Sequence, residues 1–394
     1  MNILEKIRAE HGTPFYIYDG KVISEQASIL RDTFPDFGIL FSVKANPFLP
    51  ILKKMASLGI GADAASAKEV SLALEAGMPA EDIYYSCPAP TEEDLAQIWG
   101  KCHIVADSFH ILSMLEKRAS SENRILSTAL RIHPDFTMDD SPQIASKFGI
   151  DESLIWKTDF KKEYPNLNIN GLHIHIRSQV LDTEQLCRYY AHVIELAAKL
   201  QMFLGIELRY INFGGGVGKV YDRNKQSPLN YKKLQQAIIS AKEKYALSAK
   251  LLLESGRFLA CDCGTYVTEI VDIKESHGKK FYIVKNGANG FFKPVLRQLL
   301  LPFHPDNIGA SYEPFATEND RYDIQVLSAS TETEVVDIAG HLCSGADIME
   351  KNVEVTKGAI GDLITFNHAG SYAYSLAPLL FASQPIPKEF FIDE

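Results

Sequence analysis

Short apolar runs rich in β-branched residues recur through the first two thirds of this chain, and each run ends at a polar or small residue. Segments with helical spacing, such as 67–76 and 92–99, separate the early runs. Strand and helix alternating at intervals of roughly 20–40 residues are typical of parallel βα units. The runs number eight, at 39–43, 60–65, 83–85, 104–106, 129–132, 172–176, 210–213 and 251–253. Eight favour a closed (β/α)8 TIM-like barrel over a doubly wound sheet, although both folds share this local pattern.

The pattern changes after about residue 260. Segments 266–273, 280–284, 335–338 and 362–366 alternate or run apolar, with turn-prone pieces between them, and helical periodicity is scarce. This predicts a C-terminal antiparallel β domain, which the strand-like run Phe15–Tyr18 is expected to join. We therefore expect an N-terminal strand segment at 1–30, a barrel at 31–262 and a β domain at 263–394. Residues 301–325 are interpreted as a long surface loop of a kind that is often functional.

Charge balance and cysteine content restrict the class of protein. The 394 residues include 40 Lys and Arg against 50 Asp and Glu, and a net charge of −10 disfavours broad binding to nucleic acid or an anionic membrane. No apolar run approaches the roughly 20 residues of a membrane span, and the charged N-terminus lacks the apolar stretch of a signal peptide. The 6 cysteines are too few for a disulfide scaffold, so we expect free thiols in a reducing cytoplasm.

Polar or small residues stand at the C-terminal ends of the predicted strands. The set comprises Lys44, Asp63, Arg131, His175 with Ser178, the glycines Gly214, Gly215 and Gly216, and Glu254 with Arg257. In a barrel these strand ends share one face, so the residues are expected to converge on a pocket.

Several of these residues also have a structural interpretation, which we favour for Lys44, His175 and Glu254 taken singly, whereas for the glycines the two interpretations are balanced. Lys44 could lose hydration at the barrel mouth and become an amine nucleophile, or it could extend from a strand end into solvent. The glycines at 214–216 could bring backbone N–H groups close to a phosphate, as loops after strand seven of a barrel do, or they could mark a tight turn. Glu254 could hold a protonated heteroaromatic nitrogen or pair with Arg131, and His175 could stack on a ring or be an ordinary strand histidine.

Taken together, an amine, an anion cradle, a carboxylate and a stacking imidazole match pyridoxal 5′-phosphate (PLP) group by group. The sequence also resembles the fold-type III PLP-dependent decarboxylases, the family of diaminopimelate, ornithine/arginine and carboxynorspermidine decarboxylases. The matching motifs run in family order across nearly the whole chain and are TPFYIYD at 13–19, FSVKAN at 41–46, ADAAS at 62–66, LRIHP at 130–134, SKFGI at 146–150, GLHIHIRSQ at 171–179, NFGGG at 212–216, ESGR at 254–257, CSGAD at 343–347 and AGSYAYS at 369–375. The resemblance implies an alanine racemase-like fold and looks nearest to the branch serving antibiotic and siderophore pathways.

Carried over by motif, the resemblance implies that Lys44 holds the cofactor covalently, that His175 stacks on its ring and that Glu254 pairs with its pyridine nitrogen. The other implied cofactor-binding residues are Asp63, Arg131, and, for the phosphate, Ser178, Gly214–Gly216, Arg257 and Tyr372. A carboxylate keeps the ring protonated, and a protonated ring accepts the electron pair released when carbon dioxide leaves. Alanine racemases place an arginine at this nitrogen, so Glu254 favours a decarboxylase over the racemase alternative.

Cys343 matches the family's catalytic cysteine, in a Cys-x-x-x-Asp motif that ends at Asp347. In the family this cysteine comes from the other subunit of a head-to-tail dimer and protonates the substrate carbon after decarboxylation. The resemblance therefore implies a homodimer with shared active sites. Without the motif, Cys343 would be interpreted as a small buried hydrophobe. A non-catalytic PLP carrier, the alternative from another class, has neither a β domain nor this motif.

The sequence departs from the family where substrates are held. Ser344 follows the cysteine, where diaminopimelate and ornithine decarboxylases have Glu or Asp to hold a distal ammonium. The family residues Gly, Asp, Arg and Tyr are replaced by Arg177, Lys285, Lys293 and Arg297. Fewer carboxylates and more cations favour an anionic substrate tail. We therefore predict decarboxylation of an amino acid conjugated to a polycarboxylate, such as a citryl siderophore intermediate, with diaminopimelate or a basic amino acid (ornithine, lysine or arginine) as the alternative. The predicted substrate-binding residues are Arg177, Lys293, Arg297, Ser344 and Asp347.

Cys261-Asp262-Cys263 is the remaining candidate for a ligand site. Structural zinc sites use four side chains, and no further ligand lies nearby in the sequence. We therefore interpret these cysteines as core thiols and expect no metal.

Overall fold

A computed structural model describes residues 2–139, 141, 143–302 and 320–393. The chain forms two compact units, which we call the barrel unit (Glu25–Val220 and Ser227–Phe258) and the β unit (Met1–Ser24, Tyr221–Gln226 and Leu259–Glu394). Most of the predicted loop at 301–325 lies outside the described residues. Its last two residues belong to a strand, β13, that the sequence did not predict.

The barrel unit contains the eight predicted parallel strands. They are β2 (Phe37–Ser42), β3 (Gly61–Ala64), β4 (Ile83–Ser86), β5 (His103–Ala106), β6 (Leu126–His133), β8 (Leu167–His173), β9 (Tyr210–Asn212) and β10 (Lys250–Ser255). The strands pair in the order β5-β4-β3-β2-β10-β9-β8-β6, and a further pairing of β5 with β6 closes the cylinder. A two-residue strand, β7 (Ile150–Asp151), lies beside β6. The predicted (β/α)8 barrel is therefore confirmed.

Apolar side chains from six strands fill the interior of the barrel. The cluster comprises Leu40, Tyr84, Val105, Ala129, Tyr210 and Leu252, each at most 5% exposed. In a closed eight-stranded barrel the interior is just wide enough for such side chains to fill it. Gly171 on β8 has to be small, because a Cβ there would lie 2.5 Å from the ring of Tyr210.

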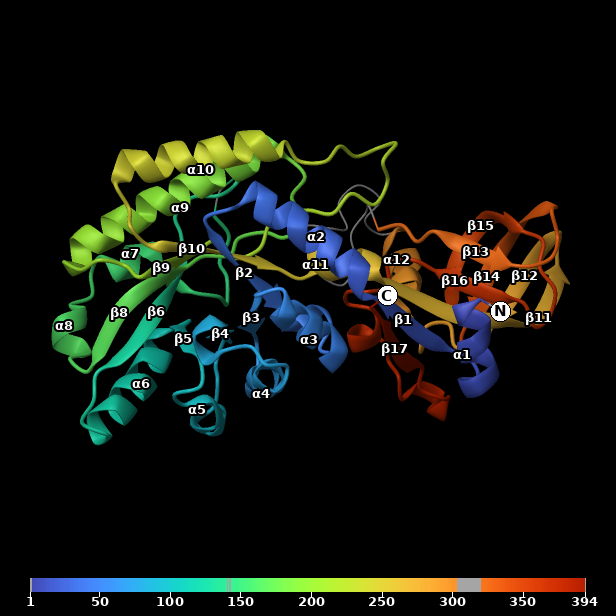
Figure 1. Ribbon diagram of the computed structural model, residues 1–394, viewed down its shortest axis with the longest axis horizontal. Helices are drawn as coiled ribbons and strands as arrows, with labels where there is room; N and C mark the ends of the chain where they lie inside the picture. Colours follow the sequence, from blue (N-terminus) through green and yellow to red (C-terminus); the bar gives the residue numbers. More distant parts are fainter. Residues whose placement is uncertain (1, 140, 142, 303–319, 394) are drawn as a thin grey trace. The chain divides into compact units, whose positions relative to one another are not determined.

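Helices surround the barrel between its strands (Figure 1). They are α2 (Gly20–Thr33), α3 (Leu49–Ser57), α4 (Ala67–Glu75), α5 (Glu92–Ile98), α6 (Phe109–Ser121), α7 (Glu152–Ile155), α8 (Phe160–Glu163), α9 (Thr183–Leu204), α10 (Tyr231–Tyr245) and α11 (Arg257–Ala260). Polar residues that follow the strands cap several of them: Ser66 accepts from Glu69 N at the start of α4, and Asp182 accepts from two amides at the start of α9. The predicted helices at 67–76 and 92–99 are confirmed as α4 and α5.

The β unit is built on a mixed sheet. Its strands are β1 (Phe15–Asp19), β11 (Gly264–Ser276), β12 (Lys279–Val284), β13 (Ile324–Leu327), β14 (Thr333–Gly340), β15 (Ile348–Thr356), β16 (Leu363–Phe366) and β17 (Lys388–Ile392). Most pairs are antiparallel, as predicted, whereas β12 with β14 and β1 with β17 run parallel. The expected N-terminal strand does join this sheet, since β1 pairs with both β11 and β17. Phe15 and Ile17 of β1 pack with Ile7 of α1 (Ile3–His11) in an apolar core.

One helix of the β unit, α12 (Phe292–Leu300), was not predicted. Its buried positions include Lys293 and Arg297. Charged residues on the inward face obscured the apolar period that identifies an amphipathic helix. The helix is possible because Lys293 and Arg297 lie beside carboxylates of the same unit.

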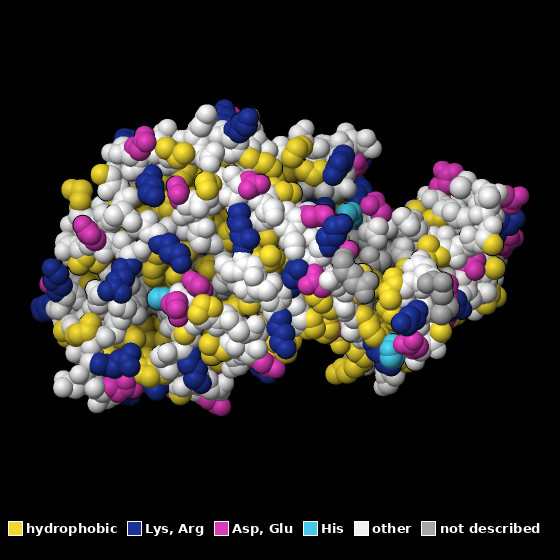
Figure 2. Space-filling model, viewed as in Figure 1, with side chains coloured by type: hydrophobic (Ala, Val, Ile, Leu, Met, Phe, Trp, Pro, Cys, Tyr) yellow, Lys and Arg dark blue, Asp and Glu magenta, His cyan; other side chains and the backbone are white. Residues whose placement is uncertain are grey.

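Charges of both signs are interspersed on the face of the molecule that Figure 2 shows. Such mixing does not form the broad basic surface that nucleic acids bind. Within the described ranges, no helix combines the length and the apolarity that crossing a bilayer requires.

Candidate active site

The lysine predicted to carry the cofactor follows β2 on a single 3-10 turn (Val43–Ala45). Lys44 Nζ lies 3.0 Å from Asp63 Oδ2 of the neighbouring strand β3. The side chain of Lys44 is 46% exposed, whereas that of Asp63 is 3% exposed. The amine therefore stands at an accessible strand end, oriented by a buried carboxylate.

Glu254 on β10 is 5% exposed and is held by two neighbours. Asn212 Nδ2 donates to Glu254 Oε1 over 2.8 Å, and His173 Nε2 lies 3.1 Å from the same oxygen. Burial acts to raise the pKa of Glu254, but the charge and hydrogen bonding of His173 and the charge on Lys44 outweigh it, so the pKa is lowered. The carboxylate is thus kept ionised, as a partner for a protonated ring nitrogen must be.

His175 follows β8 with both of its ring nitrogens engaged. Gly215 N donates to His175 Nδ1 over 3.0 Å, and Ser178 Oγ lies 3.3 Å from His175 Nε2. Because Nδ1 accepts, the neutral ring carries its proton on Nε2, toward Ser178. Loss of hydration lowers the pKa of His175 to about 3, which keeps the imidazole neutral at physiological pH. A neutral, fixed ring is suited to stacking on a planar cofactor.

The glycine loop after β9 approaches the backbone of β8 closely. Gly214 has φ of 65°, and a Cβ there would lie 2.6 Å from the carbonyl oxygen of Ile174. Gly214 N donates to Asn212 Oδ1, and Gly214 O accepts from Glu254 N. The loop therefore needs glycine and is tied to the carboxylate that it adjoins.

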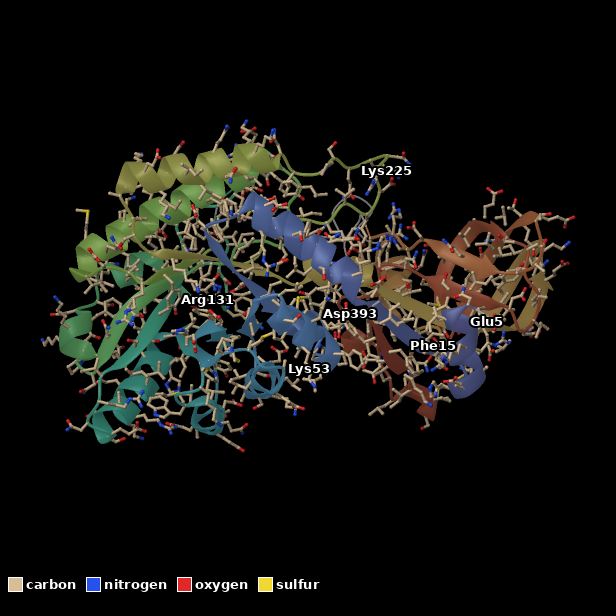
Figure 3. All side chains as sticks on the ribbon, viewed as in Figure 1. Glu5, Phe15, Lys53, Arg131, Lys225 and Asp393 are labelled. Atoms are coloured by element: carbon tan, nitrogen blue, oxygen red, sulfur yellow. The ribbon has the colours of Figure 1, made fainter. Side chains whose placement is uncertain are left out.

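The two arginines of the barrel unit that were predicted to bind the cofactor are buried. Arg131 on β6, labelled in Figure 3, lies 3.2 Å from Asp107 Oδ2 and stacks over Phe148 at 4.6 Å. Arg131 therefore pairs with Asp107 and not with Glu254, which was the structural alternative for Glu254. Arg257 is 6% exposed and begins α11, directly after β10.

The remaining predicted cofactor residue, Tyr372, lies in the β unit together with the Cys343 turn. Tyr372 is 7% exposed, and its ring faces Lys293 Nζ at 5.9 Å. Cys343 and Ser344 are exposed on the turn that follows β14. Asp347 is 2% exposed and accepts from the backbone N–H groups of Ala288 and Leu342, so it organises this turn from within. Burial raises the pKa of Asp347.

Each of the three predicted substrate-binding cations lies beside a carboxylate. The pairs are Arg177–Asp139 (2.9 Å), Lys293–Asp320 (3.4 Å) and Arg297–Glu350 (3.6 Å). Arg177 is 44% exposed, whereas Lys293 and Arg297 are buried. Arg177 is therefore the cation with the most accessible guanidinium.

Three positioning residues escaped the sequence analysis, namely His173, Asn212 and Tyr189. His173 and Asn212 occupy paired positions on β8 and β9, so they reach Glu254 together. The hydroxyl of Tyr189, on α9, donates to the carbonyl oxygen of Phe213 over 2.6 Å and lies 3.0 Å from that of Ile174, at the ends of these strands. The alternation of His173 with His175 was a signal for the first of them, since alternate residues of a strand share a face.

The part of the sequence that forms the barrel matches a known protein family. The model of the family described as "Pyridoxal-dependent decarboxylase, pyridoxal binding domain" matches residues 20–261. The chain belongs to the pyridoxal-dependent decarboxylases. It is a PLP-dependent carboxy-lyase, which disfavours the racemase and carrier alternatives.

Individual relatives align with almost the whole length of this decarboxylase. The L-glutamyl-BtrI acyl-carrier-protein decarboxylase of Niallia circulans is 30% identical over 389 residues, which cover 96% of this chain and 88% of the relative. Diaminopimelate decarboxylase of Aquifex aeolicus is 28% identical over 384 residues, covering 95% and 85%. The structure of Helicobacter pylori diaminopimelate decarboxylase complexed with L-lysine superposes with a TM-score of 0.84 at 27% identity, over 99% of this chain and 94% of that one.

The barrel residues fit PLP. Lys44 supplies an amine, Glu254 a buried anion and His175 a neutral ring, and the loop after β9 passes so close to Ile174 that Gly214 has no room for a Cβ. When bound, PLP withdraws the electron pair that the departing carboxyl group leaves behind. With PLP bound, Glu254 would hold positive charge at the ring nitrogen, and His173 and Asn212 keep that carboxylate in place.

Proposed function

We propose that this decarboxylase acts on an amino acid conjugated to a polycarboxylate, of the citryl type, rather than on a free diamino acid. The observation that carries the proposal is Ser344, which is exposed beside Cys343 where the family places an acid for a distal ammonium. The other exposed residues of this turn, Gly345 and Ala346, are uncharged. A substrate ammonium would therefore find no carboxylate on the exposed part of the turn.

Arg177 supports the same conclusion as the preferred anion-binding residue. Its partner Asp139 lies at the surface, and hydrogen bonds from Ser141 and then from Arg177 lower the pKa of Asp139 to about 2. An exposed ion pair contributes little free energy, so a substrate carboxylate can replace Asp139 at small cost. Lys293 and Arg297 would have to leave buried carboxylate partners, which costs more.

The relatives support both the proposal and its alternative. The name of the Niallia circulans relative gives it a glutamyl group joined to a carrier protein, which is also a conjugated amino acid. Diaminopimelate decarboxylases among the relatives support the alternative of a free diamino acid.

The test is a comparison of substrates. Carbon dioxide release is measured with citryl-diaminopropionate, diaminopimelate, ornithine, lysine and arginine. We expect the citryl conjugate to have the highest kcat/KM, and Arg177→Ala to raise its KM by about tenfold, with little change in kcat. Preferential turnover of a free diamino acid would show that the proposal is wrong.

We further propose a cytoplasmic homodimer in which Cys343 completes the partner's active site, on a turn that Asp347 holds from within. The exposure of Cys343 and its family motif support this arrangement. The test mixes Lys44→Ala and Cys343→Ala subunits, each inactive alone. If the sites are shared, random reassortment restores roughly a quarter of wild-type activity, because half of the dimers then contain one intact site. A mixture that remains inactive after exchange of subunits would contradict a shared site.

A further inference from the structure

A second group of chemically active side chains lies within the β unit. Cys261, Asp262 and His368 each offer a ligand atom, and the three atoms lie within 4.8 Å of one another. Asp323 adds a carboxylate, since its Oδ2 lies 3.5 Å from His368 Nε2. These residues come from three segments: the turn Cys261–Cys263, the residue before β13 and the loop after β16. We call the four residues the Cys261 cluster.

The Cys261 cluster runs from a dry interior to the surface. Cys261 is 1% exposed, and its Sγ lies 3.4 Å from the hydroxyl of Tyr221. Asp262 and His368 are half-buried, with side chains 27% and 15% exposed, and Asp323 is 68% exposed. Asp323 therefore stands at the side from which a solute would enter, and Cys261 at the closed end.

The imidazole of the cluster is held in place from several sides. His368 Nδ1 lies 2.6 Å from Asp262 Oδ1, and the ring packs edge to face against Tyr221 at 5.7 Å. His368 has φ of 60°, a left-handed conformation that a non-glycine residue adopts at a cost. The backbone on its C-terminal side is fastened to the cysteine segment, because Gly370 N donates to Cys261 O. The strained conformation is thus maintained by the surrounding structure and aims the ring at the cluster.

We propose that Cys261, Asp262 and His368 form a binding site for a zinc ion, with water in the fourth position, and that Asp323 accepts a hydrogen bond from the other ring nitrogen of His368. Zinc accepts sulfur, nitrogen and oxygen ligands in a tetrahedron, and a thiolate with an imidazole favours it over magnesium or calcium. Two ligand atoms on one such ion are separated by about 3.3 Å, so the Asp262 carboxylate has to withdraw by less than about 1 Å from His368. Binding exchanges this hydrogen bond for metal bonds, and the Cys261 thiol releases its proton to solvent. The site would join the loop after β16 to the Cys261–Cys263 turn, independently of the decarboxylation substrate.

The experiment measures zinc bound by the holoenzyme. Protein freed of metal with a chelator is dialysed against micromolar Zn²⁺, and zinc is quantified per chain. We expect one zinc per chain in the wild type, and an affinity lower by at least about 100-fold in Cys261→Ala and His368→Gln. Cd²⁺ should give a thiolate-to-metal charge-transfer band in the ultraviolet that only Cys261→Ala abolishes completely.

Matched controls separate this site from other thiols. Cys263→Ala removes the neighbouring buried thiol, and Cys343→Ser removes the exposed one, so both should retain one zinc per chain. If Cys261→Ala does not fold, Asp262→Asn tests the same site with a smaller change of shape and should also weaken zinc binding. Absence of zinc from the wild type, or equal affinity in the folded ligand variants, would overturn the proposal.

Discussion

The barrel unit and the β unit both bury charged groups, but they arrange them differently. In the barrel, His173, Asn212 and Glu254 belong to three adjacent parallel strands, and their side chains meet at one oxygen. In the β unit, each buried cation of α12 has a separate carboxylate, as in the Lys293–Asp320 pair. Parallel strands in register bring their ends to one level, so polar groups placed there reinforce one another. The barrel therefore gathers several polar groups at one carboxylate, whereas α12 pairs each of its charges separately.

The largest effect expected is that of Lys44→Ala, which removes the amine at the end of β2. We expect decarboxylation to fall by more than about 10³-fold, since no other group replaces a covalent attachment. Carbon dioxide release measures the loss, and the absorbance of bound PLP measures retention of the cofactor. Lys53→Ala, on α3 (Figure 3), is the matched control and should leave both unchanged. Substantial decarboxylation by Lys44→Ala would show that the mechanism does not need the amine at the end of β2.

Glu254→Gln tests whether the carboxylate that His173 and Asn212 contact contributes to catalysis. The amide keeps the size of the side chain but removes the negative charge at the ring nitrogen. We expect kcat to fall by about 10²–10³-fold, as when one electrostatic contact to a transition state is lost. Glu334→Gln changes a partly buried carboxylate of the β unit, which pairs with Lys280, and should change kcat less than tenfold. An equal fall of kcat in the two variants would show that Glu254 contributes no more to catalysis than a carboxylate of the β unit.

Gly171→Ala tests the packing of the barrel interior. The added methyl group would lie 2.5 Å from the ring of Tyr210, so the free energy of unfolding should fall by about 1–3 kcal/mol. Urea denaturation followed by circular dichroism measures the change. Gly345→Ala, where no atom lies within 4 Å of the added carbon, should alter stability by less than about 0.5 kcal/mol. A Gly171→Ala variant as stable as the wild type would show that the interior can expand.

The smallest expected effect concerns Glu389, which accepts from the Tyr18 hydroxyl over 2.8 Å. Burial raises the pKa of Glu389 to about 6, although the hydrogen bond from Tyr18 opposes the rise. A carboxyl group with a raised pKa stabilises the folded state fully below its unfolded pKa of about 4.3, and this contribution is lost as the pH rises through about 6.

Glu389→Gln should therefore remove a pH dependence of about 1–2 kcal/mol. The measurement is the free energy of unfolding of both proteins at pH 4.5 and pH 7.5. Between these values wild type should lose more stability than the variant. An identical difference in the two proteins would contradict the raised pKa of Glu389.

The sequence predicted the strands of the barrel unit better than those of the β unit, and the reason is physical. Every barrel strand was predicted, because a strand buried on both faces by flanking helices is a continuous apolar run. In the β unit, β13, β15 and β17 were missed, and β15 shows why: its burial alternates irregularly and its exposed positions are polar. The helix α12 was missed because Lys293 and Arg297 occupy its buried face.

The residues of the candidate site were also predicted only in part. The strand-end rule located Lys44, His175 and Glu254, whereas His173 and Asn212 required knowledge of which strands adjoin Glu254. The carboxylate partners of Arg177, Lys293 and Arg297 were also not predicted, because each comes from elsewhere in the chain.

By itself, the sequence determined the barrel and the kind of cofactor and predicted the strand ends that hold it, because these depend on local apolar periods and on the residue type at each strand end. Only the tertiary structure decided which charges are already paired, and which cysteine lies beside a histidine more than a hundred positions away. Which residues pair in space depends on the order of the strands and on the paths of the loops, and a local sequence pattern predicts neither.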